Sequence, residues 1–221
     1  MKIGIIGTGN MGSGLARRIT AAGHEVVISG RDLAKAEKAA REIGPKVKAA
    51  PLGEVAKGVD LLIAATPAGS QAEALRSAGD LTGRIVIDIA NPLKPDFSGL
   101  SVGFTTSFAE ELAKSFPGAK IVKAFNTVFA QVLSQGPDFG SGVRATAFYC
   151  GDDEQAKKTV HALIESMGFD AVDAGPLSNA RSLEPMGFMN IWLGYSAKRG
   201  TGIALNLVAR QESKAGKKKA A

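Results

Sequence analysis

Short apolar runs alternate with longer amphipathic runs along most of the chain. Buried strands are predicted where the apolar runs fall, at residues 2–6, 26–29, 61–65, 85–89 and 121–124. Helices are predicted where apolar residues recur at helical spacing, at 10–22, 33–43 and 108–116. Strands that are apolar on both faces and separated by helices are typical of a parallel sheet between two helical layers. The pattern therefore predicts an α/β fold with a doubly wound, mostly parallel sheet.

The pattern changes after residue 124, where the elements become less regular. Further helices are predicted at 127–133, 152–167 and 177–198, and further strands at 145–150, 171–172 and 203–208. A soft boundary near Cys150 divides the chain into a larger domain at 1–150 and a small C-terminal domain at 151–209. The two parts can nevertheless share one sheet.

The net charge is informative only when the positions of the charged residues along the chain are considered. The 221 residues carry a formal charge of +6, and the segment 210–221 holds +4 of it. That segment contains five basic residues, one glutamate and no aromatic residue, a composition typical of a solvated, disordered tail. The first 209 residues therefore carry only +2, which does not favour nucleic acid as a partner.

Composition also limits the class of protein and its compartment. An apolar content of 45% excludes a disordered chain. The single cysteine, Cys150, cannot form an intramolecular disulfide, which favours a reducing compartment. The sequence has neither the long apolar stretch of a membrane span nor a signal-peptide core. We therefore expect a cytoplasmic protein without a membrane partner.

The strongest chemical signal is a glycine motif directly after the first predicted strand. It reads Gly7-Thr8-Gly9-Asn10-Met11-Gly12 and opens the first predicted helix. In a dinucleotide-binding motif the first glycine makes a tight turn, the second lets backbone approach a pyrophosphate, and the third lets helix and strand pack closely. A plain tight turn is the alternative, but the position between strand and helix favours dinucleotide binding.

The end of the second predicted strand indicates which dinucleotide binds. An NAD site usually has Asp or Glu there, whereas this chain has Ser29, followed by Arg31 and, one helical turn later, Lys35. A hydroxyl and two cations can hold the 2′-phosphate of NADP, which a carboxylate would repel. In the alternative interpretation, Asp32 caps a helix and Arg31 and Lys35 are solvated surface charges.

Two further loops follow predicted strands, at the edge of the sheet where open α/β sheets bind ligands. They read Ala65-Thr66-Pro67 and Ala90-Asn91-Pro92. Small residues beside proline suit a rigid loop near the nicotinamide ribose, although each could equally be a simple loop start.

Several motifs, which follow one another along the chain in the same order as in a known family, resemble the motifs of that family. These are the glycine motif and the strings at 121–128, 150–153 and 173–181, which read IVKAFNTV, CGDD and DAGPLSNAR. Together they resemble the NADPH-dependent coenzyme F420 reductase family over nearly the whole chain. The resemblance implies a Rossmann domain with a small C-terminal α/β domain, hydride transfer between NADP(H) and coenzyme F420, and a homodimer.

The resemblance also implies roles for individual residues. Thr8, Ser29, Arg31 and Lys35 would contact the NADP phosphates. Asn126, Thr127, Val128 and Phe129 would lie near the facing rings of the two cofactors. Hydride transfer between two rings is chiefly a problem of positioning, so we predict no catalytic side chain and no metal site.

The hydride acceptor stays open among several alternatives. Some family members have a His-Thr-Ile-Pro-like segment where this chain has 125–128, and that position falls in the acceptor pocket. The same motifs also occur in relatives that resemble the cytosolic domain of membrane ferric reductases, which pass hydride from NADPH to a flavin. A small carbonyl or imine compound is another acceptor, and a non-catalytic NADPH-binding module is an alternative of a different class.

Overall fold

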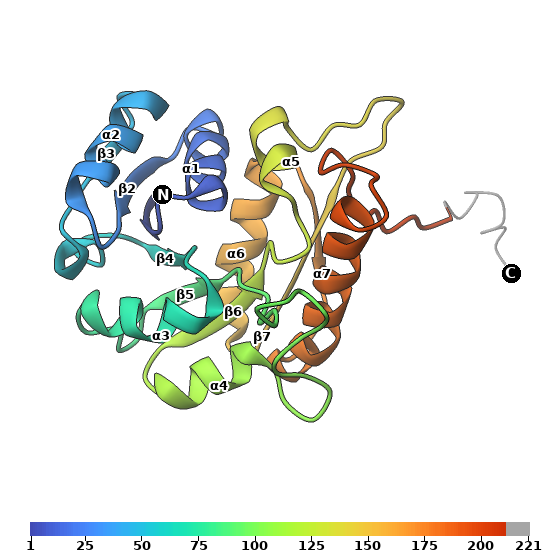
Figure 1. Ribbon diagram of the computed structural model, residues 1–221. Helices are drawn as coiled ribbons and strands as arrows, with labels where there is room; N and C mark the ends of the chain where they lie inside the picture. Colours follow the sequence, from blue (N-terminus) through green and yellow to red (C-terminus); the bar gives the residue numbers. More distant parts are fainter. Residues whose placement is uncertain (211–221) are drawn as a thin grey trace, which may run out of the picture.

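Eight strands form one sheet in the computed structural model, which describes residues 1–210 (Figure 1). Their order across the sheet is β3-β2-β1-β4-β5-β6-β7-β8. Strands β1 to β6 are parallel, β7 runs antiparallel to β6, and β8 is parallel to β7. The strands are β1 Lys2–Ile6, β2 Glu25–Ser29, β3 Val47–Ala49, β4 Leu61–Ala64, β5 Ile85–Asp88, β6 Lys120–Ala124, β7 Thr146–Gly151 and β8 Asp170–Asp173.

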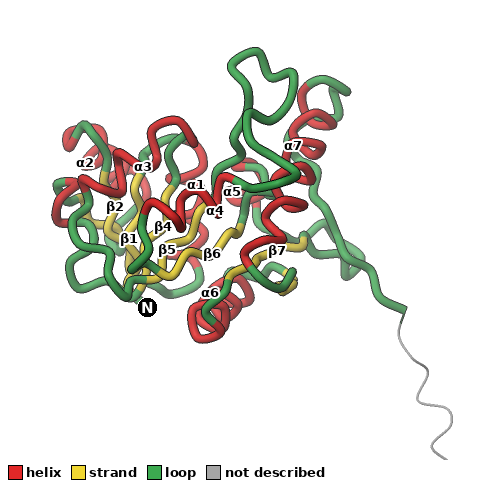
Figure 2. The backbone as a smooth tube through the Cα atoms, turned by 90° about the horizontal axis from the view of Figure 1, so that it is seen from below, coloured by secondary structure: helices red, strands yellow, loops and turns green. Residues whose placement is uncertain are grey.

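Seven helices in residues 1–210 cover both faces of this sheet (Figure 2). Alternate strand residues face opposite sides. Leu61 and Ile63 pack with residues of α1, α2, α5 and α6, whereas Leu62 and Ala64 pack with residues of α3, α4 and α7. The helices are α1 Asn10–Ala21, α2 Leu33–Ile43, α3 Ala68–Ser77, α4 Phe108–Ser115, α5 Ala130–Gln135, α6 Glu154–Ser166 and α7 Ala180–Tyr195. The predicted fold, a doubly wound and mostly parallel α/β sheet of the Rossmann type, is confirmed.

The chain changes direction across the sheet at β1. From β1 it moves outward to β2 and β3, then returns to β4 on the opposite side of β1. The loops after β1 and β4 therefore diverge and leave a crevice at the carboxyl edge of the strands, which is where open α/β sheets bind ligands. The glycine motif follows β1 at this crevice.

Several helix boundaries follow from local caps. The Asp32 carboxylate accepts a hydrogen bond from the Lys35 backbone N–H at 3.2 Å, so Asp32 caps α2. Asp153 caps α6 in the same way, with 2.7 Å to the Ala156 N–H. After α1, Gly23 adopts a φ of +93°, a left-handed conformation that ends the helix and favours glycine.

The structure differs from the sequence-based elements in a few places. The strand predicted at 203–208 is wrong: this segment makes one backbone hydrogen bond to the start of β7, from the Thr146 N–H to the Leu205 oxygen. The helix predicted at 127–133 begins only at Ala130, because Phe125 adopts a φ of +57° and redirects the chain. Strand β3 and helix α3 were not predicted.

The sheet is continuous across the boundary predicted near Cys150. Strand β7 contains that residue and pairs with β6, where Cys150 lies opposite Lys123. The two predicted parts thus share one sheet, as the sequence allowed. Of the predicted basic tail at 210–221, residues 211–221 lie outside the described residues.

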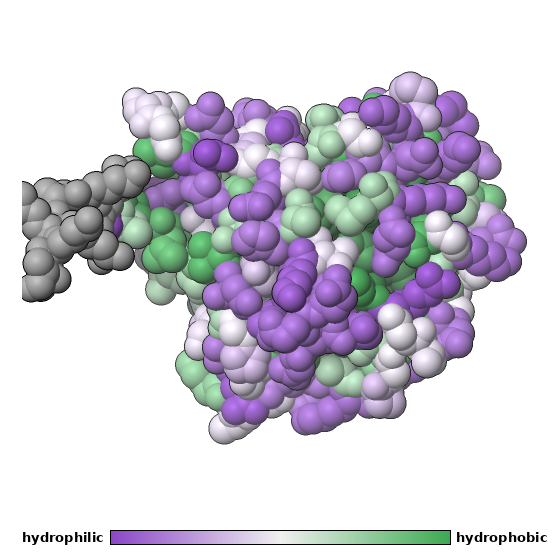
Figure 3. All heavy atoms as spheres, turned by 180° about the vertical axis from the view of Figure 1, so that it is seen from behind, coloured by the Kyte–Doolittle hydropathy of each residue, from purple (hydrophilic) through white to green (hydrophobic). Residues whose placement is uncertain are grey.

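The surface seen from behind is mostly hydrophilic, with small apolar areas between the polar side chains (Figure 3). Within residues 1–210, none of the helices combines the length and apolar character needed to cross a bilayer.

Candidate cofactor and substrate cleft

The glycine motif forms the turn between β1 and α1 with little room for side chains. Gly7 adopts a φ of +127° and donates its N–H to the Ser29 oxygen at 2.8 Å. A Cβ on Gly12 would overlap the Gly7 carbonyl, so the third glycine is needed for close packing. A Cβ on Gly9 would meet nothing within 4 Å. Gly9 therefore leaves open space at the amino end of α1.

The amino end of α1 has the properties of an anion site. Its N-cap, Gly9, provides no side-chain hydrogen bond, and the first turn of the helix contains no acidic residue. The first backbone N–H groups of a helix lack partners inside the helix, and the helix dipole gives this end a partial positive charge. A phosphate placed above Gly9 would accept hydrogen bonds from these N–H groups, and the partial positive charge would attract it.

The predicted phosphate contacts separate into two groups. Arg31 is exposed and lines a cavity of about 220 Å³ together with Thr8. The structure does not bring Ser29 to that cavity: its side chain is fully buried and its hydroxyl donates to the Ala50 oxygen at 2.7 Å. Lys35 points into solvent with 76% of its side chain exposed, 3.9 Å from Asp32 and outside the cavity. Sequence alone could not separate these residues, because burial of the Ser29 hydroxyl depends on β3.

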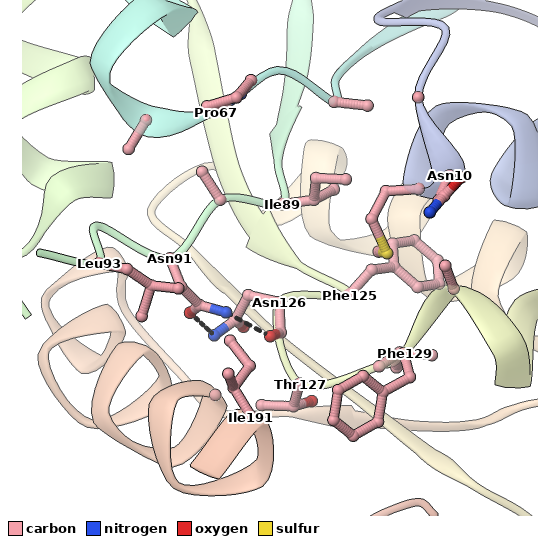
Figure 4. Close-up of a pocket in the computed structure, with 18 of the residues that line it drawn as sticks. Asn10, Pro67, Ile89, Asn91, Leu93, Phe125, Asn126, Thr127, Phe129 and Ile191 are labelled. Carbon is pink, nitrogen blue, oxygen red and sulfur yellow. Dashed lines mark hydrogen bonds between the residues drawn. The ribbon is translucent and has the colours of Figure 1, made fainter. Parts of the chain in front are cut away.

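A larger cleft of about 680 Å³ adjoins this cavity and contains most of the other predicted residues (Figure 4). The two spaces share Gly9, Ala65, Thr66 and Pro67. Pro92 is buried and does not line the cleft. Of the predicted residues, the cleft is lined by Gly9, Asn10, Met11, Ala65, Thr66, Pro67, Ala90, Asn91, Asn126, Thr127, Val128 and Phe129.

Two asparagine side chains form the floor of the cleft (Figure 4). Asn91 Nδ2 donates to the Asn126 backbone oxygen at 2.7 Å, and Asn126 Nδ2 donates to Asn91 Oδ1 at 2.9 Å. Asn126 Nδ2 also donates to the Leu183 oxygen at 2.7 Å. The loops after β5 and β6 are thereby tied to each other and to α7.

Helix α7 forms one wall of the cleft, a role that was not predicted from the sequence. Gly187, Asn190, Ile191 and Tyr195 all line the cleft. Asn190 Nδ2 donates to the Thr127 oxygen at 3.0 Å. A Cβ on Gly187 would come within 2.5 Å of Asn91 Oδ1, so only glycine allows this approach. A glycine inside a predicted helix was the signal that could have located this wall.

A buried charged cluster lies beneath the cleft. Asp88, Lys123 and Glu184 have fully buried side chains, with Lys123 Nζ at 2.8 Å from Asp88 and 2.9 Å from Glu184. Burial alone would lower the pKa of Lys123, but attraction by the two carboxylates outweighs it and raises the pKa above its ordinary value. Lys123 is therefore an ammonium ion. The sequence signal was present, since Asp88 and Lys123 interrupt otherwise apolar strands.

The cleft itself is better suited to orienting ligands than to acid–base chemistry. Its titratable lining residues in the described chain are Lys94 and Tyr195, and both are exposed. Three buried polar atoms in its walls lack a hydrogen-bond partner: Thr66 Oγ1, Asn126 Oδ1 and Thr127 Oγ1. Within residues 1–210, no group of three His, Cys, Asp or Glu side chains is arranged to hold a metal ion.

Comparisons with known proteins show the family of this chain. Residues 2–92 match the family model "NADP oxidoreductase coenzyme F420-dependent". The F420-dependent NADP reductase of Methanothermobacter marburgensis is 32% identical over 200 residues, which cover 83% of this chain and 88% of that protein. The crystal structure of a candidate F420-dependent NADP reductase from Arthrobacter sp. FB24 has a TM-score of 0.83 and 32% identity, and covers 95% of this chain and 100% of that one.

A second kind of relative is a longer protein. Metalloreductase STEAP3 of Rattus norvegicus is 31% identical over 194 residues, or 86% of this chain. This chain spans only 38% of the length of that metalloreductase.

Proposed function

The chain belongs to the coenzyme F420-dependent NADP oxidoreductase family, and from this premise we propose that it transfers a hydride between NADP(H) and coenzyme F420. The family makes the chain an NADP-dependent oxidoreductase. The observation that carries the proposal is the adjacency of two spaces: the cavity beside Arg31 continues, through Gly9 and the 65–67 loop, into the cleft floored by Asn91 and Asn126.

The residues present fit NADP. The uncapped amino end of α1 above Gly9 suits its pyrophosphate, and Arg31 with Thr8 suits the 2′-phosphate. Nicotinamide would then enter the larger cleft, where the loops at 65–67 and 90–91 border it. NADPH supplies the hydride when bound. We assign Ser29 no direct contact with the phosphate, because its hydroxyl is buried.

The protein's part in the reaction is to hold the two rings face to face. Hydride transfer needs reacting atoms about 3–3.5 Å apart and aligned. Met11, Phe129 and Ile191 provide apolar surface in the cleft, and Asn126 and Thr127 provide polar atoms at its floor. The acceptor also takes up one proton, which water can supply at the open mouth of the cleft.

Mixing the purified protein with NADPH and oxidised coenzyme F420 tests the proposal directly. We expect the absorbance of oxidised F420 to fall as NADPH is consumed. If F420 is inert but flavin mononucleotide oxidises NADPH, the second candidate, a flavin acceptor, replaces F420; the metalloreductase relative favours that candidate. If NADPH binds and no acceptor oxidises it, the chain is a binding module and the proposal fails.

We also propose that the chain forms a homodimer, as the family resemblance implies. Met189, Trp192 and Tyr195 lie on α7 and are 55%, 47% and 66% exposed. Large apolar side chains gathered on one helix are typical of a surface that a partner covers. Sedimentation equilibrium is the measurement that decides between monomer and dimer.

A further inference from the structure

The buried ammonium group of Lys123 has three oxygen atoms of the protein around it. An ammonium group has three N–H donors. Lys123 Nζ lies 2.8 Å from Asp88 Oδ2, 2.9 Å from Glu184 Oε1 and 2.5 Å from the Ala90 backbone oxygen. The three acceptors come from the end of β5, from helix α7 and from the loop after β5. Lys123 therefore connects three segments through a single atom.

On one side, Lys123 fixes the loop that leads to Asn91. It bonds the Ala90 oxygen directly, and Asp88 Oδ1 accepts from the Ala90 N–H at 2.9 Å. Gln71 of α3 donates to the same Asp88 oxygen at 2.7 Å. Both polar groups of the Ala90 backbone are thus held by the Asp88–Lys123 pair. The next residue, Asn91, contributes to the floor of the cleft.

On the other side, Lys123 fixes helix α7. Glu184 Oε1 forms an ion pair with Lys123 Nζ and accepts a hydrogen bond from the Ala109 N–H, and Oε2 accepts from the Phe108 N–H at 2.9 Å. Glu184 is therefore held at the amino end of α4, where the helix dipole favours a carboxylate. Glu184 lies one helical turn before Gly187, the residue of α7 that contacts the floor of the cleft.

We propose that Lys123 is a positioning residue: it sets the distance between the 90–91 loop and α7, and hence the spacing of the two rings in the cleft. This inference rests on the proposed function, because it concerns the geometry of hydride transfer. Lys123 does not line the cleft and is not a catalytic residue. Its effect reaches the site through Ala90 and through Glu184.

Stability alone does not explain such a cluster. Replacing a complete buried ion network with apolar residues is often neutral or stabilising, because the charges lose their hydration. What a network of fixed hydrogen bonds adds is one defined arrangement of the segments that it joins. The glycine motif and Arg31 make none of these hydrogen bonds, so the phosphate contacts of NADP should not depend on Lys123.

The variant Glu184→Gln tests the proposal with a small change. Glutamine is neutral and has one acceptor oxygen, so it cannot pair with the Lys123 ammonium while accepting from both the Phe108 and the Ala109 N–H as the carboxylate does. Lys123 keeps Asp88 and the Ala90 oxygen, which should preserve the fold. We expect hydride transfer in a single turnover to slow by about tenfold to a hundredfold. NADPH affinity should stay within about twofold, because the phosphate contacts are unchanged.

The primary deuterium isotope effect separates positioning from general destabilisation. With NADPH deuterated at the transferred position, we expect the isotope effect to become more temperature dependent in Glu184→Gln, because the rings then sample longer distances. A loss of folded protein would reduce the amplitude of the turnover but leave this dependence unchanged. A folded Glu184→Gln protein with the rate and isotope effect of the wild type would overturn the proposal.

Lysine removal has a matched control in the same chain. Lys157 also bonds two carboxylates, Glu154 at 2.9 Å and Asp173 at 3.0 Å, but its cluster lies outside the cleft. We expect Lys123→Met to lose most hydride transfer and Lys157→Met to retain it. Equal losses in the two variants would contradict a specific role for Lys123.

A readout without acceptor distinguishes this proposal from the proposed function. Fluorescence anisotropy decay of bound NADPH reports how firmly the nicotinamide ring is held. It should show a looser ring in Glu184→Gln at unchanged affinity, and an unchanged decay would contradict the proposal. If the wild type reduces neither F420 nor flavin, the proposed function fails, while this measurement still tests the positioning role.

Discussion

The two ends of the ligand site are built in different ways. At the glycine end, the turn between β1 and α1 forms the candidate anion site, and its key residues lie within a few positions of one another. The opposite end, called the asparagine end below, contains Asn91, Asn126 and Gly187. These residues come from loops and a helix that are far apart in sequence. The first end is a local structure, and the second exists only when α7 is packed against the sheet.

This difference separates binding from chemistry. Changes at the glycine end should act on affinity for the dinucleotide, and changes at the asparagine end should act on hydride transfer. The following variants test that separation, from the largest expected effect to the smallest.

Gly12→Ala should have the largest effect, because its Cβ would overlap the Gly7 carbonyl. We expect a loss of more than about 2 kcal/mol in the free energy of unfolding, together with loss of NADPH binding. Gly9→Ala is the matched variant: its Cβ meets no protein atom within 4 Å, so only the weaker N-cap preference of alanine should lower stability, by about 1 kcal/mol or less. Thermal unfolding and NADPH titration measure both. Unchanged NADPH affinity in Gly9→Ala would argue against a pyrophosphate above this residue.

Arg31→Asp should reverse the preference between the two dinucleotides. Removing the guanidinium and adding a carboxylate costs a charge-assisted contact and adds repulsion, so NADPH affinity should fall by about tenfold to a hundredfold. NADH has no 2′-phosphate and should bind as before. Lys38→Asp is the control, because Lys38 is 73% exposed on α2 and outside the cavity. Equal weakening of NADPH and NADH would exclude the assigned role of Arg31.

Gly187→Ala should disturb only the asparagine end. Its Cβ would press on Asn91 Oδ1 and on Asn126 Nδ2, so the floor of the cleft must shift. We expect hydride transfer to slow by about tenfold while NADPH affinity changes less than about twofold. Ser182→Ala, an exposed position on the same helix, provides the control. Stopped-flow single turnovers give the rate, and a variant as fast as the wild type would remove Gly187 from the site.

The smallest expected effect is a change in the pH dependence of stability caused by Cys150, which lies in the core beneath the asparagine end. Burial raises the pKa of its thiol from 9.0 to about 12. Between these values the unfolded chain loses the proton and the folded chain keeps it, so stability falls as the pH rises. The free energy of unfolding should drop by up to about 1.4 kcal/mol per pH unit in this range relative to Cys150→Ala. Parallel curves for the two proteins, from urea unfolding at pH 9 to 11, would mean that the thiol is hydrated.

The same contrast explains what the sequence could predict. Strands β1, β2, β4, β5 and β6 were located within one residue at each end, because strands buried on both faces are continuous apolar runs. The glycine motif was recognisable because its chemistry is local. Helix α3 was missed, since Ala68–Ser77 has few large apolar residues. The strand predicted at 203–208 shows the converse: an apolar run without a neighbouring strand to pair with along its length.

At the site, the limits were set by contacts between distant segments. Ser29 looked available for a phosphate until β3 brought the Ala50 oxygen to its hydroxyl. Glu184 could not be placed in the buried cluster, and Gly187 could not be placed against Asn91, because their partners, Asn91, Phe108 and Ala109, lie more than seventy residues away in sequence. Hydrophobic periodicity places a helix but does not specify which loop its glycine will face.

The position of helix α7 late in the sequence has a consequence for how the protein is made. Ribosomal synthesis delivers the glycine turn, Arg31 and the 90–91 loop first, and helix α7 only after Ala180. Domains can begin to fold while later residues are still being added. We therefore expect a nascent chain to form the glycine turn before helix α7 closes one side of the cleft. On the proposed function, a chain synthesised only as far as β8 would bind NADPH without oxidising it.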